Sequence, residues 1–526
     1  MSSDAALVVL AVVGAVVLAV VVTIVARSSG WSAPLMLVAI GAIVALVPGI
    51  PRLTISPDVI LYGILPPLLF SAAMRASLID LRTRRDPIIL SSVGLVAFTV
   101  LAVGGVSWLI VPGISVAAAF AFGAVVAPTD QVAVEAVTRR AGMPRMLSTV
   151  LDGENLLNDA TALVALNSAI VAITATITPI EIGVSFLLEV VAGLAAGLLV
   201  GFVLGYARGK LGAPVLDTSL SLVTPYLAFL LAQVAHGSGA LAVVVAGLFL
   251  GYRAPNFQSA QARVAEELNW RTIQFIVENL VFLFIGLTLP SAVMAAGDSG
   301  IPIWQLVVIA LGLLVAVMLT RLVWGAVVTP LFRYGPARLR RVGWPWVTVV
   351  PWTLAGVRGV VTLAAVFLLP AQTPDRAVLQ LFAFVIVIGT LLLAMPIPAV
   401  LRRAGLVMSA FDQERVEAEL LMAEAKAAGL EMVRECADEN TDPRVLERLK
   451  ADAEFVSASV DDGPLPTGES LNVAYAALRI RLFQAERKAV LRARAEGRFQ
   501  EAAVRKVMHV LDAEETAARV LRHGEV

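Results

Sequence analysis

Long apolar runs recur between residues 5 and 401, and they constrain what this chain can fold into more than any other feature of the sequence. Each run has about 20 residues, enough to cross the hydrocarbon core of a bilayer as an α-helix. Hydrophobic residues make up 59% of the 526 residues and charged residues only 15%, whereas soluble domains carry about 25% charged residues. We therefore predict an all-α membrane protein. Hydropathy predicts about 13 transmembrane helices, at residues 5–26, 33–50, 57–75, 87–111, 115–138, 148–174, 181–206, 216–236, 238–252, 268–289, 303–331, 346–369 and 378–401.

Basic residues are distributed unevenly between the loops that join these spans. Every second loop is basic, and together these loops carry Arg75, Arg82, Arg84, Arg85, Arg139, Arg140, Arg145, Arg208, Lys210, Arg253, Arg263, Arg333, Arg338, Arg340 and Arg341. The alternate loops carry little beyond Arg52 and Arg376. Because basic loops stay in the cytoplasm, we predict a multi-pass protein of the cell (plasma) membrane, with its N-terminus outside and its C-terminal tail in the cytoplasm.

The composition changes after residue 405. Residues 406–526 are rich in Glu, Arg and Ala, with apolar residues at helical spacing. We predict a transmembrane domain over residues 1–405 and a cytoplasmic, mostly helical tail over residues 406–526, with a linker at residues 461–466. A regulatory or dimerising tail and a solvated helical appendage both fit this pattern.

The fifth predicted span contains a helix breaker next to an acidic residue. It reads Phe122-Gly123-Ala124-Val125-Val126-Ala127-Pro128-Thr129-Asp130. Pro128 lacks a backbone donor and disfavours helix at the residue before it. The break leaves free carbonyl and amide groups beside Asp130, and irregular backbone at membrane depth occurs only where protein covers it or where it lines a cavity.

The sixth predicted span begins with a dense polar patch. It reads Asp152-Gly153-Glu154-Asn155-Leu156-Leu157-Asn158-Asp159. Helical spacing places Asn155 and Asp159 on one face, with Glu154 and Asn158 alongside. An ionisable residue inside a span indicates a functional site unless it is otherwise paired. The alternative, a capped half-helix and a helix start at the interface, does not account for three carboxylates deep within apolar flanks.

The twelfth predicted span holds one cation between glycines, in Gly356-Val357-Arg358-Gly359. The glycines indicate a second broken helix, and Arg358 is a candidate structural partner for Glu154. If the seventh span is a connector, spans 1–6 and 8–13 form two inverted six-helix repeats, and the fifth helix of each is broken. Corresponding breaks in two halves indicate a transport site. We expect Arg321 to reach water or the interface, and Glu189 and Glu278 to be packing partners or secondary sites.

Two carboxylates in a narrow, partly desolvated site repel each other, so one of them is expected to hold a proton. A hard cation with oxygen ligands can take the place of that proton. A proton and a cation then compete for the same oxygens. If the protein crosses between its two states only when the site is neutralised by one or the other, the result is coupled exchange.

The sequence resembles the cation/proton antiporters, in the sodium/proton exchanger branch that includes bacterial NhaP-type and animal exchangers. Four motifs carry the resemblance, at Leu65-Pro66-Pro67-Leu68-Leu69-Phe70, Pro128-Thr129-Asp130, Leu156-Leu157-Asn158-Asp159 and Gly356-Val357-Arg358-Gly359. The resemblance implies a 13-helix fold, a homodimer surrounded by membrane lipids, and transport by alternating access. It also implies electroneutral exchange of Na⁺ or Li⁺ for H⁺ without a cofactor, because Asn158 and Asp159 form the Asn-Asp pair of electroneutral members.

The same resemblance implies where the monovalent cation and the proton bind. The ion site maps onto Asp130, Asp159 and Thr129, with Asn158 in support, and the buried ion pair maps onto Glu154 and Arg358. Two positions depart from the family pattern. Many members carry serine at Asn155, whose amide oxygen could still bind the ion, and some carry an acidic residue within the stretch that is here Ser71-Ala72-Ala73.

Other functions remain open from the residues alone. Potassium/proton exchange is the main alternative, because oxygen ligands separate Na⁺ from K⁺ poorly. A channel would need a selectivity filter, and no filter-like repeat is present. An enzyme is disfavoured because the three histidines, His236, His509 and His523, form no cluster in the sequence. Acidic and basic residues balance at 40 each, which indicates no nucleic-acid partner.

Overall fold

A computed structural model describes residues 3–29, 31–47, 58–130, 134, 144–174, 179–211, 213–340, 343–406, 447, 451, 471–495, 507 and 510–518. The chain divides into two compact units, Met1–Met408 and Ser409–Val526. All regular structure among the described residues is helical, and none of them lies in a strand. The predicted all-α membrane fold is confirmed.

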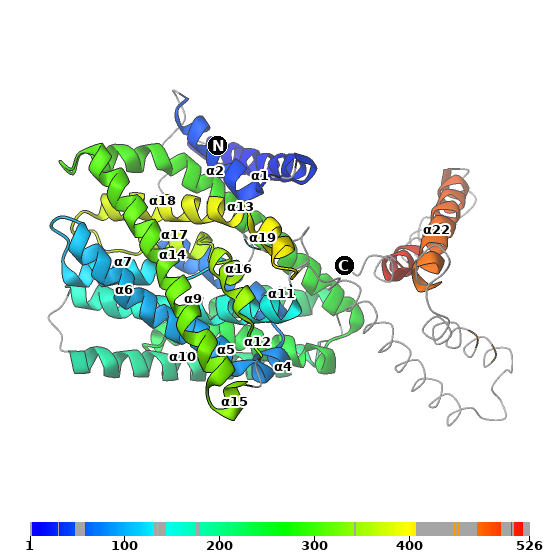
Figure 1. The fold of residues 1–526 in the computed structure, drawn as a ribbon. Helices are drawn as coiled ribbons and strands as arrows, with labels where there is room; N and C mark the ends of the chain where they lie inside the picture. Colours follow the sequence, from blue (N-terminus) through cyan, green and yellow to red (C-terminus); the bar gives the residue numbers. More distant parts are fainter. Residues whose placement is uncertain are drawn as a thin grey trace. The chain divides into compact units, whose positions relative to one another are not determined.

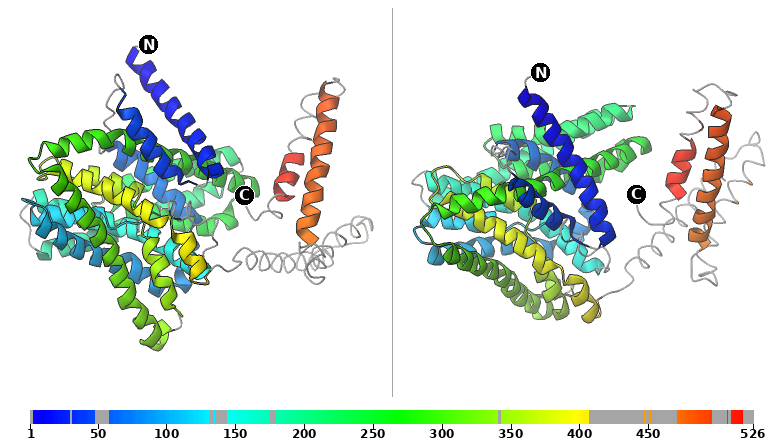
Figure 2. Two further views of the ribbon diagram at one scale, coloured as in Figure 1. Left: turned by 45° about the horizontal axis from the view of Figure 1, so that its top comes forward. Right: turned by 90° about the horizontal axis from the view of Figure 1, so that it is seen from above.

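The first unit is a bundle of helices (Figures 1 and 2). Its helices are α1 (Ser3–Ser29), α2 (Ala33–Ala45), η1 (Val59–Ile64), α3 (Leu65–Arg75), α4 (Leu78–Thr83), α5 (Arg85–Ile89), η2 (Leu90–Gly94), α6 (Leu95–Ile110), α7 (Val116–Val125), α9 (Arg145–Thr174), α10 (Pro179–Arg208), α11 (Pro214–Val234), α12 (Gly239–Phe257), α13 (Ala260–Gly297), α14 (Ile303–Tyr334), α15 (Ala337–Arg340), η3 (Trp346–Thr348), α16 (Val349–Leu354), α17 (Val360–Phe367), α18 (Arg376–Ala394) and α19 (Ile397–Arg403). Eight spans within the described residues are long and apolar enough to cross a membrane, and four shorter apolar helices accompany them. The count of 13 and the inverted repeats stay predictions.

Serine side chains mark where several of these helices begin. Ser115, Ser238 and Ser259 each accept a hydrogen bond from the backbone N–H three residues further on, at 3.2, 3.3 and 3.2 Å. This is the N-cap arrangement, which satisfies a backbone donor that the first turn of a helix leaves free. The sequence thus fixes the starts of α7, α12 and α13 locally.

Both predicted breaks are present. α7 ends at Val125, and residues 126–130 are not helical. α16 ends at Leu354, and α17 begins at Val360. Apart from Val134, the part of the fifth predicted span that follows Asp130 lies outside the described residues.

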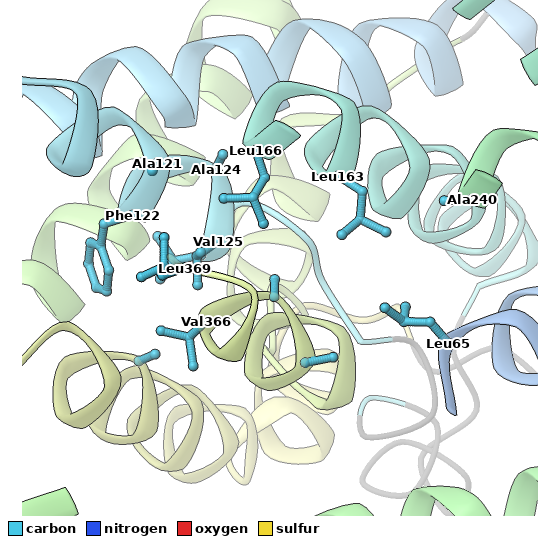
Figure 3. Packing of buried hydrophobic residues seen from close by; sticks show 14 of the residues in the cluster. Leu65, Ala121, Phe122, Ala124, Val125, Leu163, Leu166, Ala240, Val366 and Leu369 are labelled. Carbon is cyan, nitrogen blue, oxygen red and sulfur yellow. The ribbon is translucent and has the colours of Figure 1, made fainter. Parts of the chain in front are cut away.

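The apolar core holds the broken helices in place. Phe122 and Val125 at the end of α7 pack in one cluster with Leu163 and Leu166 of α9 and with Val366 of α17. Figure 3 shows these side chains converging from three helices around the end of α7. Burial of such side chains stabilises each by about 1.5–3 kcal/mol in soluble proteins, but between apolar membrane helices close packing contributes the larger share. The core therefore holds the end of α7 against α9 and α17.

Helices α2 and α13 approach each other without side chains between them. A Cβ added to Gly41 would lie 2.5 Å from the carbonyl oxygen of Leu283, and one added to Gly286 would lie 2.2 Å from that of Val38 and 2.8 Å from the Cα of Gly41. Small residues let membrane helices pack at the shortest backbone distance. The two glycines thus form one contact in which each occupies the space that a methyl group on the other would need.

A buried polar cluster joins one end of α10, α11, α12 and α13. Arg208 binds Asp217 through two hydrogen bonds of 3.0 and 2.9 Å and binds Glu266 at 2.8 Å. Gln258 donates to both carboxylates, at 2.7 and 2.6 Å. Because every carboxylate oxygen accepts a hydrogen bond, the cluster holds four helix ends in one arrangement.

The second unit is helical where it is described. α22 (Leu471–Ala495) packs Ile480 and Phe483 against Ala518, and Arg479 lies 3.0 Å from Glu514. The predicted linker at residues 461–466 lies outside the described residues.

Candidate functional site

The two broken helices cross at their breaks. The backbone N–H of Asp130 donates to the carbonyl oxygen of Val357 at 2.7 Å, and Arg358 Nε donates to the carbonyl oxygen of Val126 at 2.6 Å. The hydroxyl of Thr362 on α17 donates to the carbonyl oxygen of Pro128 at 3.4 Å. Backbone groups that leave a helix at membrane depth need partners. Each broken segment supplies partners for the other.

The carboxylate of Asp130 lies at the start of α17. Its Oδ2 accepts the backbone N–H of Val360 at 3.4 Å, where the positive end of the helix dipole favours a negative charge. This position requires glycine at residue 359, because an added Cβ would lie 1.7 Å from Asp130 Oδ2. The glycine that flanks Arg358 in the sequence is therefore explained by the space that the carboxylate fills.

Side chains of α9 connect to the break through Thr129. Asn158 Nδ2 donates to Thr129 Oγ1 at 2.7 Å, and the Thr129 hydroxyl in turn donates to Asn155 Oδ1. All three side chains are buried. The structure thus brings Thr129, Asn155 and Asn158 together, and it shows that the amide oxygen of Asn155 accepts the threonine hydroxyl.

Asp159 completes the group on α9. Its carboxylate lies close enough to Asp130 for the two charges to interact. Asp159 Oδ1 and Asn158 Oδ1 are both buried, and neither has a hydrogen-bond donor among the described residues. A hard cation takes oxygen ligands of this kind. The residues present therefore fit a monovalent cation as substrate, for which Asp159, Asp130 and Asn158 offer oxygen ligands.

The buried ion pair differs from the prediction. Glu154 is paired with Arg321 of α14, and Trp352 of α16 donates its indole N–H to Glu154 Oε2 at 2.9 Å. Arg321 stacks on the ring of Trp352, with Cζ 4.1 Å from the ring centre, and its side chain is 1% exposed. The prediction that Glu154 pairs with Arg358 is wrong, because its partner is Arg321. The expectation that Arg321 reaches water or the interface is also wrong, because Arg321 is buried.

Arg358 has a different environment. Its guanidinium donates to the carbonyl oxygens of Val126 and Gly356, both at 2.6 Å, and its backbone N–H donates to Thr390 Oγ1 of α18 at 2.9 Å. The breaks free these carbonyls, and Arg358 satisfies them. This is the physical reason why it does not reach the carboxylate of Glu154.

Sequence reasoning missed the roles of Arg321, Trp352 and Thr390. One signal could have found Arg321, because a cation in the middle of an apolar span needs a buried partner as much as a carboxylate does. Nothing in the sequence distinguishes Trp352 or Thr390 from ordinary core residues.

Partly buried carboxylates beside two crossing broken helices define a class of protein, the membrane transporters of small cations. The comparisons with known proteins specify the family. A family model described as "Sodium/hydrogen exchanger, transmembrane" matches residues 15–403, and the chain belongs to this family.

Relatives agree with this assignment. An uncharacterised Na⁺/H⁺ exchanger of Mycobacterium bovis is 31% identical, over 96% of this chain and 95% of its own. A "Sodium, potassium, lithium and rubidium/H(+) antiporter" of Bacillus pumilus is 30% identical, over 69% of this chain and 56% of its own. The fold resembles that of the sodium proton antiporter MjNhaP1 from Methanocaldococcus jannaschii, with a TM-score of 0.61, 16% identity, and coverage of 76% of this chain and 99% of that one.

Proposed function

We propose that this protein exchanges Na⁺ or Li⁺ for H⁺ across the cytoplasmic membrane, electroneutrally and by alternating access. The observation that carries the proposal is the buried Oδ1 of Asp159, which has no hydrogen-bond partner among the described residues and lies near the carboxylate of Asp130. A proton or a cation bound there relieves the repulsion between the two carboxylates. Because the two loads compete for the same oxygens, binding of one releases the other.

Formal charges support one-for-one exchange. Asp130, Asp159 and Glu154 contribute three negative charges, and Arg321 and Arg358 contribute two positive charges, so the unloaded group carries a net charge of −1. One proton or one monovalent cation brings this sum to zero. An uncompensated charge is costly at membrane depth. The loaded group can therefore change sides, whereas the unloaded group is held back.

Potassium/proton exchange is the second candidate function. The antiporter of Bacillus pumilus is named for sodium, potassium, lithium and rubidium, and oxygen ligands of the kind found at Asp159 can bind each of these ions. A homodimer, an outside N-terminus and a cytoplasmic tail over residues 406–526 complete the proposal.

Cation-driven proton flux in proteoliposomes tests the function. Na⁺ or Li⁺ is expected to drive proton movement by the wild type, and a comparison with K⁺ separates the two candidates. Asp159→Asn should abolish the flux while the protein stays folded, and Asp130→Asn should nearly do so. Asp152→Asn is the matched control, because Asp152 is an exposed acid on the same helix. Normal exchange by a well-folded Asp159→Asn protein would overturn the proposal.

A further inference from the structure

Glu189 is a second carboxylate inside an apolar span, and the site described above does not use it. It lies on α10 between residues that face outward, including Leu187 and Leu188, which are 62% and 61% exposed. Its own side chain is half-buried and forms a hydrogen bond with the side chain of Asn167 on α9. Its Oε2 is buried and has no hydrogen-bond partner among the described residues. A carboxylate with a bare oxygen is costly within a span, and this points to a ligand.

Asn167 connects Glu189 to the ion site. It lies on the same helix as Asp159, about two turns or roughly 12 Å further along the axis. It lies toward the end of α9 that the basic loops assign to the outside. Glu189 therefore stands between Asp159 and the outer face.

The backbone holds Glu189 firmly at this position. Its carbonyl oxygen accepts the N–H of Ser238 at 2.9 Å, at the turn between α11 and α12. One turn further along α10, a Cβ on Gly193 would lie 2.7 Å from the carbonyl oxygen of Ser238. Helices α10 and α12 thus touch through backbone, which holds the backbone of Glu189 in place.

No cation neutralises this carboxylate within the described part of the chain. Helix α9 contributes the neutral Asn167 and, two turns away, Asp159. The adjoining half of α11 contributes the phenol of Tyr226, and residues 239–250 of α12 contribute no ionisable group. His236 in the turn between these helices is exposed.

We propose that Glu189 and Asn167 form a relay site that takes the transported cation or proton between Asp159 and the outer face. The bare Oε2 supplies the ligand oxygen or accepts the proton, and Asn167 holds the carboxylate toward α9. This inference rests on the proposed exchange function and adds a second, outer site to it.

Membrane vesicles of both orientations test the relay, because they present either the outer or the inner face to added Na⁺. Glu189→Gln should raise the half-saturating Na⁺ concentration at the outer face by roughly three- to tenfold, because ions that enter from outside then lose a charged ligand on the way to Asp159. The inner-face value and the rate at saturating Na⁺ should stay close to wild type. Glu181→Gln is the matched control, since Glu181 is exposed at the start of the same helix.

The outcomes separate the two proposals. Wild-type vesicles without Na⁺-dependent proton flux would reject the exchange function itself. Wild-type vesicles that exchange, with Glu189→Gln unchanged at the outer face or shifted equally at both faces, would reject only the relay. Asn167→Ala provides a second variant should Glu189→Gln fold poorly, and it should shift the outer-face value in the same direction by a smaller factor.

Discussion

At the scale of single residues, the partner of Glu154 determines which substitutions destabilise the protein. Removing one partner of a buried pair leaves the other charge uncompensated, at a cost of about 3–5 kcal/mol. Arg321→Ala and Glu154→Ala should therefore each lower the melting temperature of the purified protein strongly. Replacing both residues together should recover part of the loss, because no single charge is then left buried. Thermal unfolding followed by intrinsic fluorescence measures each change.

Arg338→Ala is the control for this series. Arg338 pairs with Asp86 at 2.5 Å, but its side chain is 62% exposed. Exposed pairs contribute little because water screens them. A melting temperature that falls as far for Arg338→Ala as for Arg321→Ala would contradict the distinction between the two pairs.

A methyl group at residue 359 should inactivate the protein. Gly359→Ala places a Cβ where Asp130 Oδ2 lies, so the carboxylate must leave the start of α17 or the crossing must open. We expect loss of Na⁺-dependent proton flux together with a lower melting temperature. Gly105→Ala on α6 is the matched control, since an added Cβ there meets nothing within 4 Å. Equal activity of the two variants would show that Asp130 does not need its observed position.

At the scale of elements, the crossing of the broken helices depends on α18. Thr390→Val keeps the shape of the side chain but removes the oxygen that accepts the Arg358 backbone N–H. An unsatisfied buried donor costs about 1–3 kcal/mol, so we expect a lower melting temperature and reduced flux. Thr320→Val is the comparison, because within the described part of the chain the Thr320 hydroxyl bonds only to Ala316 of its own helix. Thr390→Val should be clearly the more damaging of the two.

The elements also show what the sequence could predict. Both breaks were predictable because Pro128 and the glycines beside Arg358 act on the backbone locally. The partner of Glu154 could not be predicted from the sequence. Arg321 and Arg358 both lie in spans that approach α9, and only the packing of the helices decides which of them pairs with Glu154. The family motifs predicted that Asp130 and Asp159 lie near each other, whereas the contact of Thr129 with Asn155 depends on how the break crosses α9.

At the scale of the whole molecule, the charge sum predicts the response to voltage. One cation exchanged for one proton moves no net charge, so a membrane potential should not change the initial rate of exchange. A moved unit charge would instead contribute about 2.3 kcal/mol per 100 mV. A membrane potential is set with valinomycin in potassium-loaded proteoliposomes. Proteoliposomes with the Asp159→Asn variant measure the proton leak that does not pass through the exchanger. A rate that rises with one polarity and falls with the other would contradict one-for-one exchange.

The contact between Gly41 and Gly286 limits which substitutions this protein can accept as it evolves. A larger residue at either position is blocked by the backbone of the opposite helix, whatever residue the other position holds. Neither glycine can therefore be replaced one substitution at a time without loss of the folded contact, unless α2 and α13 first move apart. In a library of random variants, both positions should tolerate fewer replacements than the predicted site residue Asn155, and descendants that diverge widely elsewhere should keep both glycines.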